Sequence, residues 1–191
     1  MHIGLFFGSF NPIHIGHLVL AEYMTGFTSL EQVWFVVSPH NPLKSKDSLL
    51  EDHHRLEMVH LAVDDDNRFR VSDIEFRMPQ PSYTIDTLTY MKEKFSDHKF
   101  SLIMGADNLE SFHKWKNAGK IIQDYRRFVY PRHGLSSENL QSHEKITMVN
   151  APRIEISSSF IRQSIREGKS VRYFLPEKVF EYIDRMNFYK K

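Results

Sequence analysis

Short apolar segments alternate along the chain with segments of helical period. Six apolar segments have the length and composition of β-strands, at residues 2–7, 32–37, 69–74, 100–104, 127–130 and 146–149. Two intervening stretches, one after Asp52 and one after Ser82, space their apolar residues three or four positions apart: Leu56, Val59 and Val63 in the first, and Ile85, Leu88, Met91 or Lys92, and Phe95 in the second. This alternation predicts βαβ units and right-handed crossovers.

The pattern therefore predicts an α/β fold of the Rossmann-like, doubly wound type, with helices on both faces of a mostly parallel sheet. Ligands of such sheets bind at the carboxyl ends of the strands, near the point where the strand order reverses. Residues 176–186 predict a closing amphipathic helix with proline in its first turn. We expect residues 1–191 to form a single domain, with a C-terminal helical segment from about 157 to 186.

Composition narrows the function classes. A hydrophobic content of 41% with 26% charged residues is typical of a globular protein, and excludes disorder as the main state. The net charge of +1 argues against nucleic acid or an anionic membrane as a partner. No apolar run approaches the roughly 18 to 20 residues of a membrane span, and Met1–Gly4 opens a strand pattern without a signal peptide. With no cysteine in the chain, we expect a cytoplasmic protein.

The segment directly after the first predicted strand carries the most chemistry. Residues 8–17 read GSFNPIHIGH. Gly8 permits close backbone approach, Asn11-Pro12 favours a turn, and a helix is expected to begin near Ile15. A helix start carries partial positive charge and binds phosphate. His14 and His17 can both point into such an anion site, so the segment predicts a phosphate-binding loop.

Each histidine has other interpretations. A single histidine on a helix is often a surface or core residue without chemistry. A metal site is a second rival, although no nearby carboxylate or third ligand completes a zinc set in the sequence. The combination of a strand, a Gly-Ser loop and paired histidines favours phosphate binding over either alternative.

The motif HIGH at residues 14–17 resembles the HxGH signature of the nucleotidylyltransferase superfamily. The segment ISSSFIR at residues 156–162 resembles a second signature of that superfamily. The resemblance implies a late helix whose serine hydroxyls and arginine bind the ATP phosphates. The residues agree, because a serine N-cap followed one turn later by a guanidinium suits phosphate. Taken alone, the serine run would indicate simple helix capping.

Three further segments make the chain similar to the nicotinate-nucleotide adenylyltransferase family. SPHNPLK at 38–44 resembles a loop that brings a basic residue to the phosphates. PSYTIDTL at 81–88 resembles the segment that helps to hold the nicotinate ring and carboxylate. GADN at 105–108 and SFHKW at 111–115 resemble the strand end that contacts ribose and the tryptophan that borders the nicotinate. Lys116 stands where relatives frequently carry an aromatic residue.

The resemblance implies three sets of site residues. Catalytic roles fall on His14, His17, Lys44 and Arg162. ATP-binding roles fall on Gly8, Ser9, Phe10, Gly105, Asp107, Ser157, Ser158 and Ser159. Nicotinate nucleotide-binding roles fall on Tyr83, Thr84 and Trp115. Without the resemblance, Tyr83 and Trp115 could be core residues, and Lys44 a solvated loop charge.

The implied reaction is adenylyl transfer from ATP to nicotinate mononucleotide, which gives nicotinate adenine dinucleotide and pyrophosphate. We expect Mg²⁺ carried on the ATP phosphates and no protein-built metal site. The expected partners are ATP and nicotinate mononucleotide, with homo-oligomer formation left open. Alternative acceptors are phosphopantetheine and nicotinamide mononucleotide. A nucleotide-binding sensor without turnover is the alternative from another class.

Overall fold

A computed structural model describes residues 1–39, 49–132 and 144–190. Six strands form one sheet in the order β3-β2-β1-β4-β5-β6, and every neighbouring pair is parallel. Their bounds are β1 (His2–Gly8), β2 (Gln32–Val37), β3 (Phe69–Ser72), β4 (Lys99–Gly105), β5 (Arg126–Tyr130) and β6 (Ile146–Met148). The predicted doubly wound parallel sheet is confirmed.

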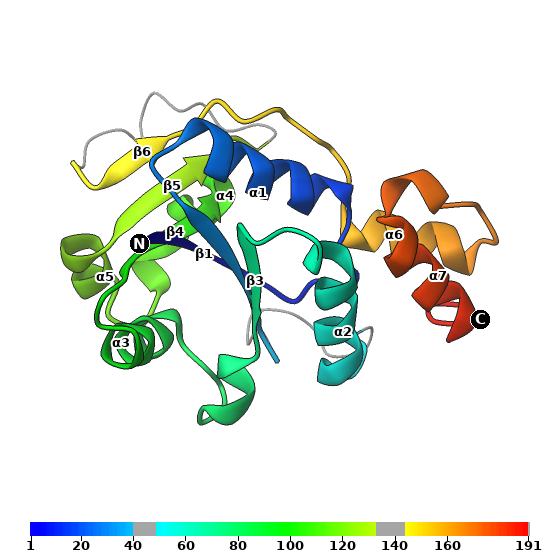
Figure 1. Cartoon of the computed structure of the whole chain (residues 1–191), viewed down its shortest axis with the longest axis horizontal. Helices are drawn as coiled ribbons and strands as arrows, with labels where there is room; N and C mark the ends of the chain where they lie inside the picture. Colours follow the sequence, from blue (N-terminus) through cyan, green and yellow to red (C-terminus); the bar gives the residue numbers. More distant parts are fainter. Residues whose placement is uncertain (40–48, 133–143, 191) are drawn as a thin grey trace.

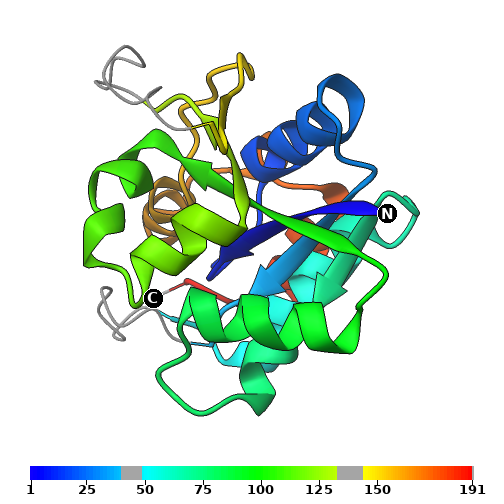
Figure 2. The ribbon, with the colours of Figure 1, turned by 90° about the vertical axis from the view of Figure 1, so that its left-hand side faces the viewer.

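The α-helices are α1 (Ile15–Phe27), α2 (Asp52–Val63), α3 (Thr84–Lys94), α4 (Ala106–Glu110), α5 (Ala118–Asp124), α6 (Ser158–Arg166) and α7 (Glu177–Arg185). The described residues also form the short 3₁₀ helices η1 (Ile74–Arg77), η2 (Phe112–Lys114) and η4 (Arg172–Phe174). Figure 1 shows α2 beside α7, and Figure 2 shows α1 and α3 on opposite sides of the strands. The described helices therefore cover both faces of the sheet.

Alternate strand residues feed two separate hydrophobic cores, as the two-residue period of a strand requires. Phe35 and its neighbours on one face pack with α1, α2, α6 and α7. Trp34 and Val36 on the other face pack with α3, α4, η2 and α5. The sheet thus separates a core that carries the N-terminal loop and the C-terminal helices from a core that carries α3 and η2.

Two differences from the predicted boundaries have a local structural cause, and the other strand bounds differ from the prediction by at most one residue. The third strand ends at Ser72 rather than Ile74, because the Asp73 carbonyl accepts the Phe76 amide at 2.9 Å and starts η1. The last helix begins at Glu177, and Pro176 is its N-cap rather than its first-turn residue. Lys44 lies outside the described residues, as do residues 136–142, whose polar composition predicts an exposed loop.

The reversal of strand order lies between β1 and β4, which are neighbours although β2 and β3 separate them in the sequence. Because these two strands are parallel, their last residues, Gly8 and Gly105, lie at the same edge of the sheet, where the carboxyl ends of the strands meet. A ligand of a doubly wound sheet is expected at this position. Within the described parts of the chain, no helix is both long and apolar enough to cross a membrane.

Candidate functional site

Four carbonyl oxygens between the end of β1 and Pro12 accept hydrogen bonds from the surrounding protein. The donors are the Ser38 amide to Gly8 at 2.9 Å, the Arg55 guanidinium to Ser9 at 2.6 Å, the Arg162 guanidinium to Asn11 at 2.7 Å and the Ser158 hydroxyl to Pro12 at 2.9 Å. A trans peptide points its N–H opposite to its carbonyl. The amides of Ser9, Phe10 and Ile13 therefore point away from these donors, an arrangement that suits an anion.

Arg55, on α2, is the main clamp of this loop and is fully buried. Besides Ser9, its guanidinium donates to the carbonyls of Ser38 at 2.8 Å, Pro39 at 3.1 Å and Leu50 at 2.9 Å, and it pairs with the Asp52 carboxylate. Burial lowers the pKa of the Arg55 guanidinium, and the bond to Asp52 opposes that effect. The chain segments after β1 and β2 are thus held by one side chain that sequence reasoning did not select.

His14 and His17 lie together at the start of α1, with ring centroids 3.8 Å apart. The His14 amide donates to Nδ1 of His17 at 3.2 Å. A neutral His17 ring must then carry its proton on Nε2, which makes Nε2 a hydrogen-bond donor. The structure brings the two histidines together as the sequence predicted.

His14 is only 5% exposed, and its Nδ1 has no hydrogen-bond partner among the described residues. Burial, assisted by the positive charge of Arg132, lowers the pKa of the His14 imidazole to about 4. In the free protein at neutral pH, His14 is therefore an uncharged ring with an unused polar atom. It can offer a hydrogen bond to a ligand, whereas the charge that protonation would give is absent.

This buried imidazole makes stability depend on pH. Between pH 6.5, the pKa of an unperturbed histidine, and about 4, the unfolded chain binds a proton at His14 that the folded chain does not. The free energy of unfolding should therefore fall as pH decreases through this window, by up to about 1.4 kcal/mol per pH unit from this group. His14→Gln removes the titration.

Urea unfolding of the wild type and His14→Gln at pH 7 and pH 5 tests this expectation. The stability difference between the two proteins should change by about 2 kcal/mol in favour of the variant at pH 5. Equal losses of stability in both proteins would contradict the assignment to His14.

Glycines make room for rings around the histidine pair. A β-carbon at Gly8 would lie 2.8 Å from the ring of Phe10, and one at Gly16 would lie 3.0 Å from Nδ1 of His14. Phe10 is buried and packs edge-on against His17, with centroids 5.1 Å apart. The space above Gly8 therefore holds a side chain that orients His17, so any contact of Phe10 with ATP would have to come from its backbone.

The serines at the start of α6 have distinct structural roles. Ser157 is the N-cap and accepts the Phe160 amide at 3.1 Å, so the capping interpretation holds for this residue. Ser158 bonds the Pro12 carbonyl, and the Ser159 hydroxyl accepts from Arg162 at 3.2 Å. Burial lowers the pKa of the half-buried Arg162 guanidinium. The predicted second signature thus lies directly against the predicted phosphate loop.

At the end of the neighbouring strand, Gly105 allows a carboxylate to fold back over the backbone. A β-carbon at Gly105 would lie 2.3 Å from Oδ1 of Asp107 and 3.2 Å from the Arg132 side chain. Asp107 is exposed, and its carboxylate lies 3.8 Å from the Arg132 guanidinium. This pair stands at the same sheet edge as the loop after β1.

The predicted acceptor residues lie at the start of α3 and just after η2, on the other face of the sheet. Thr84 is the first residue of α3, whose N-cap, Tyr83, gives no side-chain cap. Lys116 bonds the Asp86 carboxylate at 2.7 Å, and its ammonium lies 4.7 Å from the Tyr83 ring centroid. Trp115 is half-buried and packs on Phe112 at 4.9 Å. Tyr83 is 38% exposed, so the alternative that it is a core residue is wrong.

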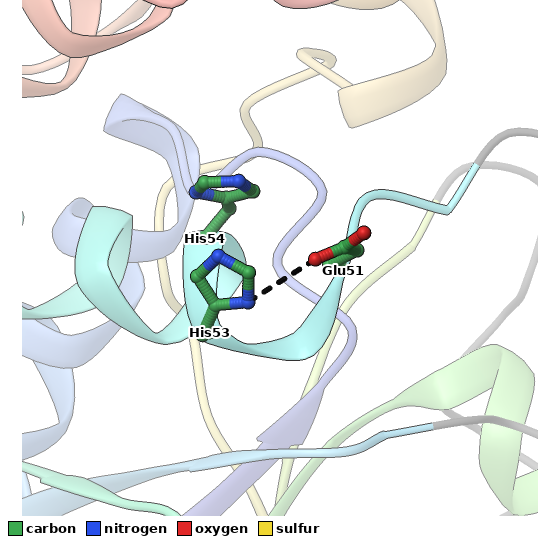
Figure 3. A group of neighbouring side chains, drawn as sticks. All are labelled: Glu51, His53 and His54. Carbon is green, nitrogen blue, oxygen red and sulfur yellow. Dashed lines mark ion pairs between the residues drawn. The ribbon is translucent and has the colours of Figure 1, made fainter.

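One group of described His, Asp and Glu side chains is close enough to share a metal ion: Glu51, His53 and His54. Figure 3 shows the Glu51 carboxylate beside the His53 ring, with the His54 ring over it; the Glu51–His53 distance is 3.4 Å. Nδ1 of His54 already contacts the Tyr182 hydroxyl at 2.9 Å, and the positive end of α2 opposes a cation here. The group includes neither His14 nor His17.

Sequence comparison with known proteins shows the family of this chain. A sequence profile of the cytidylyltransferase-like family matches residues 5–164. A probable nicotinate-nucleotide adenylyltransferase of Flavobacterium johnsoniae is 55% identical over 193 aligned residues, which cover 100% of both chains. The chain belongs to the nicotinate-nucleotide adenylyltransferase family. Another member of this adenylyltransferase family, from Bacteroides fragilis, is 46% identical over 180 residues, 94% of this chain and 90% of its own.

A solved structure supports the fold of this adenylyltransferase family member. The Plasmodium falciparum nicotinic acid mononucleotide adenylyltransferase complexed with NaAD matches with a TM-score of 0.82 over 98% of this chain and 97% of its own, at 20% identity. The resemblance drawn from the sequence motifs is therefore confirmed for family and fold. The roles of individual site residues stay predictions, and Lys44 lies outside the described residues.

Proposed function

We propose that this protein transfers the adenylyl group of ATP to nicotinate mononucleotide, which gives nicotinate adenine dinucleotide and pyrophosphate. The observation that carries the proposal is the loop after β1, with its carbonyls bound by the scaffold and its histidine pair at the strand-order reversal. The name and 55% identity of the Flavobacterium johnsoniae relative support the choice of acceptor.

The proposed step is an in-line attack of the acceptor phosphate on the α-phosphorus of ATP. One bond forms from the attacking oxygen to phosphorus, the bond to the bridging oxygen breaks, and pyrophosphate leaves with that electron pair. A phosphate monoester has a second pKa near ~6 and is ionised at neutral pH, so no general base is needed. Catalysis is then positioning and charge stabilisation.

The described residues supply donors for that charge. Nε2 of His17, His14 and the loop amides are proposed to bind oxygens around the α-phosphorus. Arg162, with Ser159 on its guanidinium, is proposed to bind the β and γ phosphates. Lys44 is proposed to join Arg162 there.

The proposal includes Mg²⁺ bound to the ATP phosphates. Asp107 is the carboxylate beside Gly105 at this edge, and it faces Arg132, which disfavours a cation held by protein ligands alone. A hard cation that keeps most of its water and binds phosphate oxygens fits this surrounding. When bound, the ion would neutralise the charge of the leaving pyrophosphate. We further propose that the site prefers magnesium to other divalent ions.

Lys116 gives this chain a specific means of selecting an acid over an amide. Its ammonium has three donors, so it can keep the Asp86 carboxylate and also bind a nicotinate carboxylate at the start of α3. Lys116→Met should lower kcat/KM for nicotinate mononucleotide about tenfold, which corresponds to about 1.4 kcal/mol, and leave that for nicotinamide mononucleotide unchanged.

The matched control is Lys114→Met, an exposed lysine on η2 two residues away. It should change neither value. A tenfold loss with both acceptors in Lys116→Met would show that the lysine supports the fold of the site rather than its choice of acid.

Pyrophosphate release tests the proposed function. The purified chain with ATP and Mg²⁺ should release pyrophosphate with nicotinate mononucleotide, and more slowly with nicotinamide mononucleotide or phosphopantetheine. Faster turnover with another acceptor would overturn the acceptor assignment. ATP binding without release for any acceptor would favour the sensor alternative.

The cellular setting is part of the same proposal. We place the enzyme in the cytoplasm, where ATP and magnesium are available and a chain without cysteine has no need of disulfides. Nucleotides are its proposed partners, and neither nucleic acid nor membrane is.

A further inference from the structure

The end of the described chain reaches back to the phosphate loop. The hydroxyl of Tyr189 donates to Oδ1 of Asn11 at 2.7 Å. The Leu50 amide also lies 3.4 Å from that oxygen, a longer and weaker contact. The backbone carbonyl of the same Asn11 accepts from Arg162 at 2.7 Å. Tyr189 and Arg162 therefore hold one loop residue from two sides.

Backbone strain marks Tyr189 and the residue that precedes its partner Asn11. Tyr189 has φ of +63°, and Phe10, next to Asn11, has φ of +44°. A left-handed conformation is unfavourable for a bulky residue and persists only where its surroundings enforce it. Phe188 packs on His54 of α2, with centroids 4.6 Å apart, and Tyr189 packs against the same core as Phe10. These contacts enforce the turn that brings the phenol to the loop.

The Tyr189 phenol stays protonated over the pH range in which proteins are folded, and it donates its hydrogen bond to Asn11. Burial raises the pKa of Tyr189, and the nearby charges of Arg162 and Arg55 only partly oppose that effect. The contact is therefore a neutral hydrogen bond that joins the last described turn to the loop before His14.

We propose that Tyr189 is a positioning residue, which holds Asn11 and through it the phosphate loop in the geometry that binds the triphosphate. The inference rests on the proposed function of the loop, namely that it binds ATP phosphates. It adds a residue from the C-terminal tail, outside both signature motifs, to the parts that determine ATP use. Because Tyr189 packs with the core of the loop and not with that of α3, the acceptor half should be unaffected.

The test compares Tyr189→Phe with Tyr182→Phe. Both variants remove one tyrosine hydroxyl from the same C-terminal region, but the hydroxyl of Tyr182 contacts His54 and not the loop. Tyr189→Phe should weaken ATP binding, measured by calorimetry, about fivefold, as expected from the loss of one neutral hydrogen bond. The KM for nicotinate mononucleotide should be unchanged, and Tyr182→Phe should bind ATP like the wild type.

A double-mutant cycle separates positioning from general packing. Asn11→Asp keeps an acceptor oxygen, so adding Tyr189→Phe to it should still weaken ATP binding about fivefold. Asn11→Ala removes the acceptor, and adding Tyr189→Phe should then have no further effect. The inference is overturned if Tyr189→Phe binds ATP as well as the wild type does, if the Tyr182 control loses as much, or if the two effects simply add in the alanine background.

Calorimetry keeps this test separate from the proposed function. If the wild type binds ATP but releases no pyrophosphate, the proposed reaction fails. The proposed role of Tyr189 is then still decided by whether Tyr189→Phe binds ATP about fivefold more weakly. If the wild type releases pyrophosphate and Tyr189→Phe binds ATP normally, the proposed reaction stands and the proposed role of Tyr189 fails.

Discussion

Replacement of His17 by alanine is expected to lower kcat for pyrophosphate release by about a hundredfold or more. The ring is held in one orientation: Nδ1 accepts the His14 amide at 3.2 Å, and Phe10 packs edge-on against it at 5.1 Å. Its Nε2 is thereby a fixed donor, which needs no rearrangement as charge develops on the phosphates. Loss of one such preorganised donor typically costs about 10² to 10³ in kcat.

His53→Ala provides the matched control, because His53 is an exposed histidine on α2 whose partner is the exposed Glu51. That variant should turn over like the wild type. The KM for ATP should change much less than kcat in His17→Ala, since the donor acts mainly on the transition state. Turnover within a few fold of the wild type would remove His17 from the proposed chemistry.

Arg55→Met is expected to lower the free energy of unfolding by about 4 kcal/mol and to weaken ATP binding at the same time. The variant leaves four backbone carbonyls without their common donor: those of Ser9, Ser38, Pro39 and Leu50. Each unsatisfied buried carbonyl costs about 1 to 3 kcal/mol, partly recovered by water or rearrangement. The carbonyl of Ser9 belongs to the loop itself, so its release should disorder the phosphate site.

Arg77→Met is the comparison for this variant. Arg77 is exposed and pairs with Asp73 one helical turn away, an arrangement worth about 0.5 kcal/mol or less. Urea unfolding and ATP calorimetry on both variants should therefore show a large loss for Arg55 and almost none for Arg77. A loss of stability in Arg55→Met with unchanged ATP affinity would show that the clamp supports the fold without setting the loop.

Local patterns in the sequence were sufficient to predict the sheet and the loop. Strand period, helix period and the run GSFNPIHIGH are properties of neighbouring residues, and each predicted strand is present with its bounds within two residues of those predicted. The paired histidines were predictable for the same reason, since three residues at the start of a helix fix their separation. The β3 boundary was missed because a single turn at Asp73 ends the strand early.

The clamp at Arg55 and the contact of Tyr189 could not be predicted in this way. An arginine on a helix is usually a solvated charge, and only the packing of α2 against the loops after β1 and β2 buries Arg55. The partner of Tyr189 lies near the other end of the chain, so no local pattern links it to Asn11. The pairing of Lys116 with Asp86 likewise depends on how η2 approaches α3.

Because the sheet separates two hydrophobic cores, substitutions on one face should have little effect on the other face. The proposed phosphate loop rests on the core of α1, α2, α6 and α7, and the proposed acceptor residues lie on the side of α3, α4, η2 and α5, with the sheet between them. Substitutions in groups that share no partners combine additively. A lineage could therefore exchange a residue such as Lys116 and acquire a different acceptor, while the proposed phosphate loop is inherited unchanged.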